Sequence, residues 1–153
     1  MRPGTAGYDA DFLMNQLIIP AHIFEEMIAH CREAHPNEAC GILAGRGNEV
    51  LKIYKMSNIE NSPVSYFMDS GEQFRVMKDM REKSLDMVAI FHSHPASAAY
   101  PSPKDMSLAF YEDAVYVIAS LTGKEPEVKA FSIIGGEIRE VEMLVEGKSP
   151  DVS

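Results

Sequence analysis

The chain has 153 residues, of which 46% are hydrophobic and 24% charged, and a formal net charge of −9, totals that are typical of one ordinary soluble globular domain. The acidic balance argues against a nucleic-acid partner, because phosphate binding depends on clustered Lys and Arg. The sequence has no apolar run near the roughly 20 residues that a membrane span requires, no secretory signal and no disulfide framework, which predicts a cytoplasmic protein without a membrane partner.

Periodicity and turn residues divide the chain into one domain, 15–146, between a flexible N-terminal extension, 1–14, and a flexible tail, 147–153. In chain order the patterns predict a strand over 16–19, a helix from Pro20 to Pro36, strands over 39–45 and 50–56, a loop over 57–63, a short extended piece over 64–68, a helix capped by Asp69 or Ser70, a buried strand over 87–91, a short helix from Ser102, and strands over 114–121, 128–134 and 137–145.

The helices are recognised by apolar residues that recur at the 3.6-residue period. The expected inward residues are Ile23, Met27, Ile28 and Cys31 in the first helix, Phe74, Met77 and either Met80 or Arg81 in the second, and Met106, Ala109 and Phe110 in the third. The strand 87–91 is apolar at every position, as a central strand covered on both faces would be.

Two histidines follow this central strand directly. Because strand side chains alternate, we expect His92 and His94 on the same side as Val88 and Ile90. Taken alone, a His-x-His pair at a strand end is more often structural than a metal ligand.

Ser102 and Asp105 permit two interpretations. Ser102 fits the N-cap of the short helix, and its spacing to Asp105 is that of a capping box. Alternatively, the Asp105 carboxylate joins the two imidazoles and completes three of the four positions of a catalytic zinc site, with the fourth open for water. We expect these roles to exclude each other, since a carboxylate turned towards zinc would leave the backbone of Ser102.

The zinc interpretation implies hydrolysis, because bound zinc lowers the pKa of water to about 7 and polarises a carbonyl. Glu38, directly before the small-residue strand 39–45, is the candidate general acid/base. Ser102 is the candidate donor to the developing oxyanion. Considered alone, Glu38 would be interpreted as a solvated charge.

The joint pattern of Glu38, His92-x-His94 and Ser102-x-x-Asp105 resembles the JAMM motif of the MPN-plus zinc metalloproteases. The resemblance implies that His92, His94 and Asp105 bind Zn²⁺, that Glu38 is the general acid/base and that Ser102 stabilises the oxyanion. It also implies the α/β JAMM/MPN fold, similar to cytidine deaminases, with a curved mixed β-sheet flanked by helices in a single domain.

Further stretches resemble the stand-alone bacterial branch of this family, which includes the CysO-cysteine peptidase. They are 35–45, 58–63, 69–73 and 99–102. The resemblance implies hydrolysis of the peptide or isopeptide bond after the C-terminal Gly-Gly tail of a ubiquitin-like sulfur-carrier protein, with a zinc-bound water as the nucleophile. We expect the tail to be held extended against a sheet edge, for which the segment 64–68 is the candidate.

Two other functions remain open on the sequence. One is a non-catalytic MPN scaffold for protein interactions, and the other is hydrolysis of a small-molecule amide at the same zinc site. Deamination is disfavoured, because zinc deaminases use His-x-Glu and Pro-Cys-x-x-Cys motifs, which this sequence lacks. Whether the protein forms a homodimer is also left open.

Overall fold

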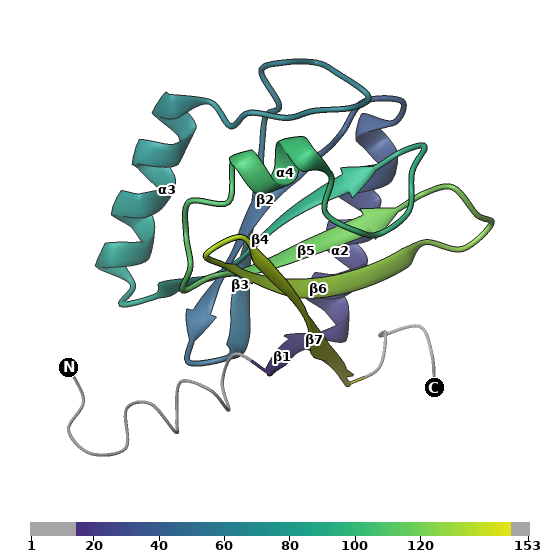
Figure 1. The fold of residues 1–153 in the computed structure, drawn as a ribbon. Helices are drawn as coiled ribbons and strands as arrows, with labels where there is room; N and C mark the ends of the chain where they lie inside the picture. Colours follow the sequence, from purple (N-terminus) through teal and green to yellow (C-terminus); the bar gives the residue numbers. More distant parts are fainter. Residues whose placement is uncertain (1–14, 148–153) are drawn as a thin grey trace.

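The computed structural model describes residues 15–147 (Figure 1). In chain order the elements are β1 (Gln16–Pro20), α2 (Ala21–Ala34), β2 (Cys40–Arg46), β3 (Glu49–Met56), α3 (Ser70–Glu82), β4 (Asp86–His94), α4 (Pro103–Ser107), β5 (Val115–Ser120), β6 (Glu127–Ile134) and β7 (Glu137–Glu146). The flexible ends expected at 1–14 and 147–153 lie outside the described residues, except for Gly147. None of the described helices is long and apolar enough to cross a membrane.

The strands form one mixed sheet that closes on itself in the order β1-β3-β2-β4-β5-β6-β7. β1 runs parallel to β3 and β7, β4 runs parallel to β5, and the other neighbours are antiparallel. Helix α2 covers one face of the sheet, while α3 and α4 lie over the other (Figure 1). The α/β architecture with a curved mixed sheet and flanking helices, expected from the resemblance, is confirmed.

Two apolar clusters fill the two faces of the sheet. The first packs the buried side of α2 against the strands and includes Met27, Leu43 and Phe91. The second lies under α3 and the loop after β3 and includes Ile42, Met80 and Ile118. The alternation of side chains along β2 and β4 therefore decides which of their residues face the second cluster, where the histidines lie.

The register between β2 and β4 shifts between Leu43 and Ala44, which leaves Val88 as an extra residue on β4. Val88 consequently packs in the first cluster with Ala89 and Phe91, whereas Ile90 packs in the second. The expectation that Val88 shares a side with the histidines is wrong, because such a bulge interrupts the two-residue period.

Two residues expected on inward helix faces are exposed. Phe74 of α3 is 71% exposed, because the inward stripe of that helix runs through Met77 and Met80 and leaves Phe74 to one side. Phe110 is 70% exposed, because α4 ends at Ser107 and the chain beyond it no longer has helical period.

The segment 57–68 is a loop, and the short extended piece expected at 64–68 is not a strand of the sheet. Its only ladder contact within the described residues is an isolated antiparallel bridge between Asn58 and Met68. The loop folds back on itself over the second cluster, in which Tyr66 and Met68 are buried. The candidate sheet edge for the substrate tail is therefore absent at this position.

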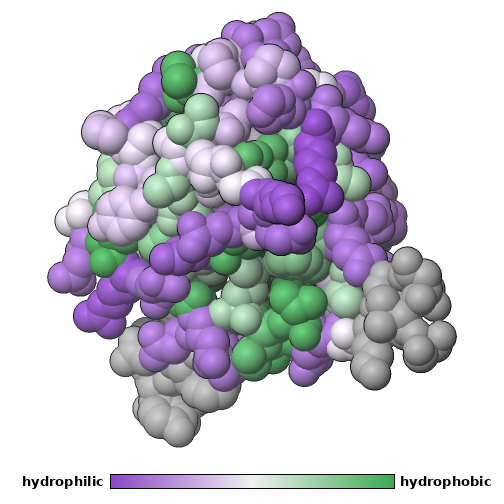
Figure 2. Space-filling model, turned by 90° about the vertical axis from the view of Figure 1, so that its right-hand side faces the viewer, coloured by the Kyte–Doolittle hydropathy of each residue, from purple (hydrophilic) through white to green (hydrophobic). Residues whose placement is uncertain are grey.

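On the face shown in Figure 2, hydrophilic residues predominate and hydrophobic ones gather in the lower part. Because the chain has 23 Asp and Glu but only 14 Lys and Arg, its field favours a neutral or basic partner.

The close approach of β2 to Phe91 requires glycine at position 41. A Cβ built there would lie 2.3 Å from the Phe91 ring and 2.6 Å from the Tyr54 carbonyl oxygen. We expect Gly41→Ala to lower the free energy of unfolding by about 1–3 kcal/mol through overpacking, measured by urea denaturation. Gly123→Ala, whose added Cβ meets nothing nearer than 3.6 Å, is the matched control, and equal losses in both variants would contradict the steric explanation.

Candidate metal centre

His92 and His94 end β4, and both side chains are buried on the second-cluster face of the sheet. Ser93 between them points to the opposite face, where its Oγ accepts the Ala39 N–H at 2.8 Å. The His94 Nδ1–H donates to the Ala98 carbonyl oxygen at 2.7 Å, which leaves the lone pair of Nε2 directed into the centre.

Asp105 reaches the histidines from the first turn of α4. Its Oδ2 lies 3.0 Å from His94 Nε2 and 3.2 Å from His92 Nε2, and the two Nε2 atoms are 3.1 Å apart. Ligand atoms of a tetrahedral zinc site with bonds of about 2.0–2.1 Å lie about 3.3 Å from one another. Within the described residues the three side chains form a group that fits one small metal ion.

Asp105 also closes the capping box, which corrects the expectation that the two roles exclude each other. The same Oδ2 accepts the Ser102 N–H at 2.9 Å, while the Asp105 N–H donates to Ser102 Oγ at 3.1 Å. Both roles are compatible because each oxygen of an ionised carboxylate has about two lone-pair sites, one for the Ser102 N–H and one on the side of the imidazoles. The bond from Asp105 uses a lone pair of Ser102 Oγ and leaves the hydroxyl hydrogen able to donate to a substrate.

The electrostatic surroundings keep Asp105 ionised. Burial alone would raise the pKa of its carboxyl, but the adjacent imidazoles of His92 and His94 and the N–H of Ser102 hold that pKa well below its usual value. An ionised carboxylate beside two imidazoles is the donor set that zinc prefers in a catalytic site.

Glu38 is buried next to this group, with 4% of its surface exposed. Among residues 15–147, its Oε1 has no hydrogen-bond partner, and burial raises the pKa of the carboxyl from 4.5 to about 8, opposed in part by the charge of His94. The structure therefore brings together all the residues singled out in the sequence: three converging side-chain atoms that could hold a metal ion, a capping hydroxyl and a dehydrated carboxyl.

Three residues that the sequence did not single out shape the centre. Ser93 joins the histidine strand to Ala39, which directly follows Glu38. Tyr66 stacks on the His92 ring with centroids 4.6 Å apart, and the Asn58 side chain donates to the Glu38 carbonyl oxygen. Strand alternation would have placed Ser93, but no periodic signal points to the two loop residues.

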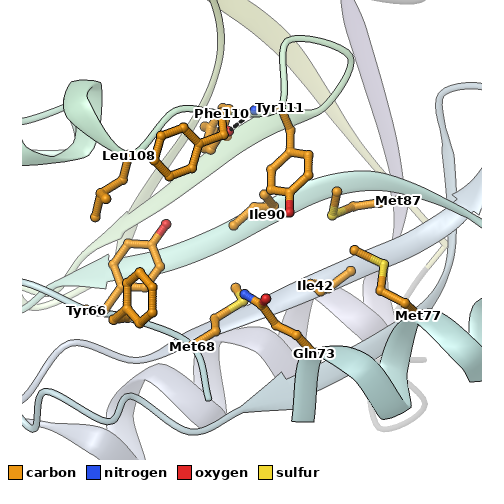
Figure 3. Close-up of a pocket in the computed structure, with 12 residues that line it drawn as sticks. Ile42, Tyr66, Met68, Gln73, Met77, Met87, Ile90, Leu108, Phe110 and Tyr111 are labelled. Carbon is orange, nitrogen blue, oxygen red and sulfur yellow. Dashed lines mark hydrogen bonds between the residues drawn. The ribbon is translucent and has the colours of Figure 1, made fainter. Parts of the chain in front are cut away.

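An apolar cavity of about 150 Å³ adjoins the centre (Figure 3). Its walls come from β2, β4 and β5 of the sheet, from the loop after β3, from α3 and from the segment after α4 (Figure 3). They include Tyr66, Met68, Met77, Ile90 and Phe110. Tyr66 both lines the cavity and covers His92, so the metal-ligand group and the cavity share a wall.

The chain matches the family of prokaryotic homologues of the JAB domain over residues 20–134. It is 41% identical over 129 residues to the CysO-cysteine peptidase of Mycobacterium tuberculosis, a match that covers 81% of this chain and 87% of the relative. It is 34% identical over 130 residues to the "Probable TtuB-protein conjugate cleaving protease" of Thermus thermophilus, covering 84% and 82% of the two chains.

Solved structures show the same architecture. A protein from Desulfitobacterium hafniense superposes with a TM-score of 0.79 at 38% identity, covering 89% of this chain and 97% of that one. A JAB1/MPN domain protein from Archaeoglobus fulgidus superposes with a TM-score of 0.57 at 18% identity, covering 84% and 98%. The second likeness concerns the fold alone, and it agrees with the JAMM/MPN fold expected from the sequence.

Glu38→Gln tests whether the Glu38 carboxyl is dehydrated in the folded protein, through the pH dependence of the free energy of unfolding. The folded-state pKa of about 8 exceeds the ordinary 4.5, so between these values the folded protein keeps a proton that the unfolded chain releases, and stability falls as pH rises. In metal-free protein we expect E38Q to exceed wild type by about 5 kcal/mol at about pH 9 and to equal it below about pH 4.

Urea unfolding of both proteins in the presence of a chelator measures this difference. Glu33→Gln, at an exposed position of α2, is the control and should leave the pH dependence unchanged. A stability gap for E38Q that is the same at both pH values would show that the carboxyl is not dehydrated in the folded protein.

Proposed function

Because the chain belongs to the prokaryotic JAB-domain family, we propose that it is a zinc metallopeptidase that acts on a ubiquitin-like protein. The observation that carries the proposal is the convergence of two imidazole nitrogens and one carboxylate oxygen within 3.2 Å of one another, next to a buried carboxyl with a raised pKa. His92, His94 and Asp105 would hold Zn²⁺. When bound there, zinc supplies a Lewis acid that acidifies water and polarises the scissile carbonyl.

The chain's own residues complete the reaction. Glu38 Oε1 takes the proton of the attacking water and delivers it to the leaving amine. A pKa near neutrality, which burial gives this carboxyl, suits a group that must both accept and donate a proton. Ser102 Oγ donates its hydroxyl hydrogen to the oxyanion that develops at the carbonyl.

We infer that the substrate is a ubiquitin-like sulfur carrier cleaved after its C-terminal Gly-Gly tail, in the cytoplasm. The names of two relatives support this, since one describes a CysO-cysteine peptidase and the other a protease of TtuB-protein conjugates. The apolar cavity that shares Tyr66 with the centre suits an apolar side chain of such a tail. The complete ligand group distinguishes this proposal from a scaffold without metal.

Incubation with sulfur-carrier proteins that carry a C-terminal cysteine or a peptide extension tests the activity, with intact mass spectrometry as the measurement. We expect the zinc-loaded protein to release the extension after Gly-Gly. E38Q should retain the metal and lose at least about 100-fold in kcat, as expected for removal of a general base. Cleavage by E38Q at near the wild-type rate would rule out Glu38 as the base, and cleavage of small amides alone would favour the small-molecule alternative.

Asp105→Asn isolates the metal-binding role of Asp105 from its capping role. Asparagine keeps an oxygen for the Ser102 N–H but loses the negative charge, so we expect zinc affinity to fall by at least about 100-fold with little loss of stability. Competition with a chromogenic chelator measures the affinity. Ser102→Ala keeps the three ligands and should bind one zinc per chain; equal affinity of D105N and wild type would contradict the assignment.

A further inference from the structure

We propose that Asn58 is a positioning residue for the reaction, and that its side-chain amide holds Glu38 in place relative to His92. The inference rests on the proposed function, because it concerns the base of that same centre. Asn58 lies outside the five-residue motif, at the start of the loop 57–68. Its side chain is only partly exposed and contacts both the segment that carries the base and the loop that covers the first histidine.

The Asn58 amide uses all of its hydrogen-bonding capacity. Nδ2 donates to the carbonyl oxygens of Glu38 and Ser65, each at 3.0 Å. Oδ1 accepts the N–H groups of Glu60 at 3.0 Å and Phe67 at 3.1 Å. Two carbonyl oxygens thus surround Nδ2, and two N–H groups surround Oδ1. A reversed amide would place oxygen against oxygen and N–H against N–H, so these partners set the orientation of the amide.

The same loop holds Glu38 by both of its backbone groups. Its N–H donates to the Ser62 carbonyl oxygen at 2.8 Å, and its carbonyl accepts from Asn58. The carboxyl oxygen Oε1, in contrast, has no hydrogen-bond partner in the part of the chain that the structure describes. The direction of this oxygen therefore depends on where the backbone of Glu38 is held and on packing, and a small shift of the backbone would move the base away from the metal-ligand group.

Asn58 also fixes the residue that covers His92. Its amide bonds to Ser65 and Phe67, which lie on either side of Tyr66. The Tyr66 ring stacks on His92 at an interplanar angle of 27°. One side chain thus connects the backbone of the base to the ring that packs on a metal ligand, which is the arrangement expected of a positioning residue.

Asn58→Asp tests this role with almost no change in shape. Aspartate keeps an oxygen for Glu60 and Phe67, but it loses both donors and places a second oxygen against the carbonyls of Glu38 and Ser65. We expect kcat on the carrier substrate to fall by about 100-fold, with KM little changed and one zinc retained per chain. Asn61→Gly, in the same loop at an exposed position with φ of +45°, is the control and should keep the wild-type kcat.

A readout without catalysis accompanies the kinetics. In hydrogen–deuterium exchange, the Glu38 amide should exchange about tenfold faster or more in N58D, because the loop that accepts its N–H is released. The Ala39 amide, whose N–H donates to Ser93 Oγ, should keep its protection against exchange. A global loss of stability would accelerate both amides together, so the contrast separates positioning from unfolding.

Several results would overturn the proposal. They are a kcat of N58D within about twofold of wild type, a rise in KM at constant kcat, loss of zinc in parallel with activity, or unchanged exchange of the Glu38 amide. If N58D does not fold, Asn58→Ala replaces it, with the same expectations. If the wild-type protein cleaves no carrier, the proposed function fails, and the exchange measurement alone decides whether Asn58 positions Glu38.

Discussion

The paired hydrogen bonds between Ala39 and Ser93 are the constraint on which the centre depends. The Ala39 N–H donates to Ser93 Oγ at 2.8 Å, and the Ser93 N–H donates to the Ala39 carbonyl at 3.0 Å. Each bond contributes only about 1 kcal/mol, but both are buried, so a shift of either segment would leave polar groups unpaired. Glu38 precedes Ala39 and the two histidines flank Ser93, which means that this pairing fixes the distance between the carboxyl and the imidazoles.

The same constraint keeps Glu38 in an unfavourable environment. A buried carboxyl whose Oε1 has no hydrogen-bond partner among the described residues destabilises the fold once it ionises, and a folded-state pKa of about 8 expresses that cost. The apolar clusters on both faces of β2 and β4 offset it, helped by Gly41, which lets Phe91 pack against the strand. Buried titratable groups with strongly shifted pKa values occur preferentially at functional sites.

Asp105 shows how local and long-range requirements agree in this fold. As a capping residue it satisfies the N–H of Ser102 at the start of α4, and with the same oxygen it lies within 3.2 Å of both imidazoles. The cap thereby holds the carboxylate in the orientation that a metal site would require, so the Asp105 side chain has little conformational entropy left to lose there. Because α4 is only five residues long, its position depends on few bonds of its own. The capping box and the contacts of Asp105 with the two imidazoles therefore hold the start of this helix together.

Sequence reasoning succeeded where one period or one spacing carried the information. Helical and alternating patterns located the strands and helices, and the spacing of His92, His94 and Asp105 indicated the residues that the structure brings together. It failed at Val88, because a bulge is set by pairing with β2 and not by the period of β4, and at Phe74, because the inward face of α3 depends on the strands beneath it.

The loop 57–68 lies beyond such reasoning for a related physical reason. Much of its order comes from the Asn58 side chain, which bonds to backbone groups two, seven, nine and twenty residues away in the chain. Bonds of this kind leave no repeating pattern in the sequence, since almost any residue can supply a backbone N–H or carbonyl. The residue that connects Glu38 to the ring over His92 is thus visible only once the chain has been folded.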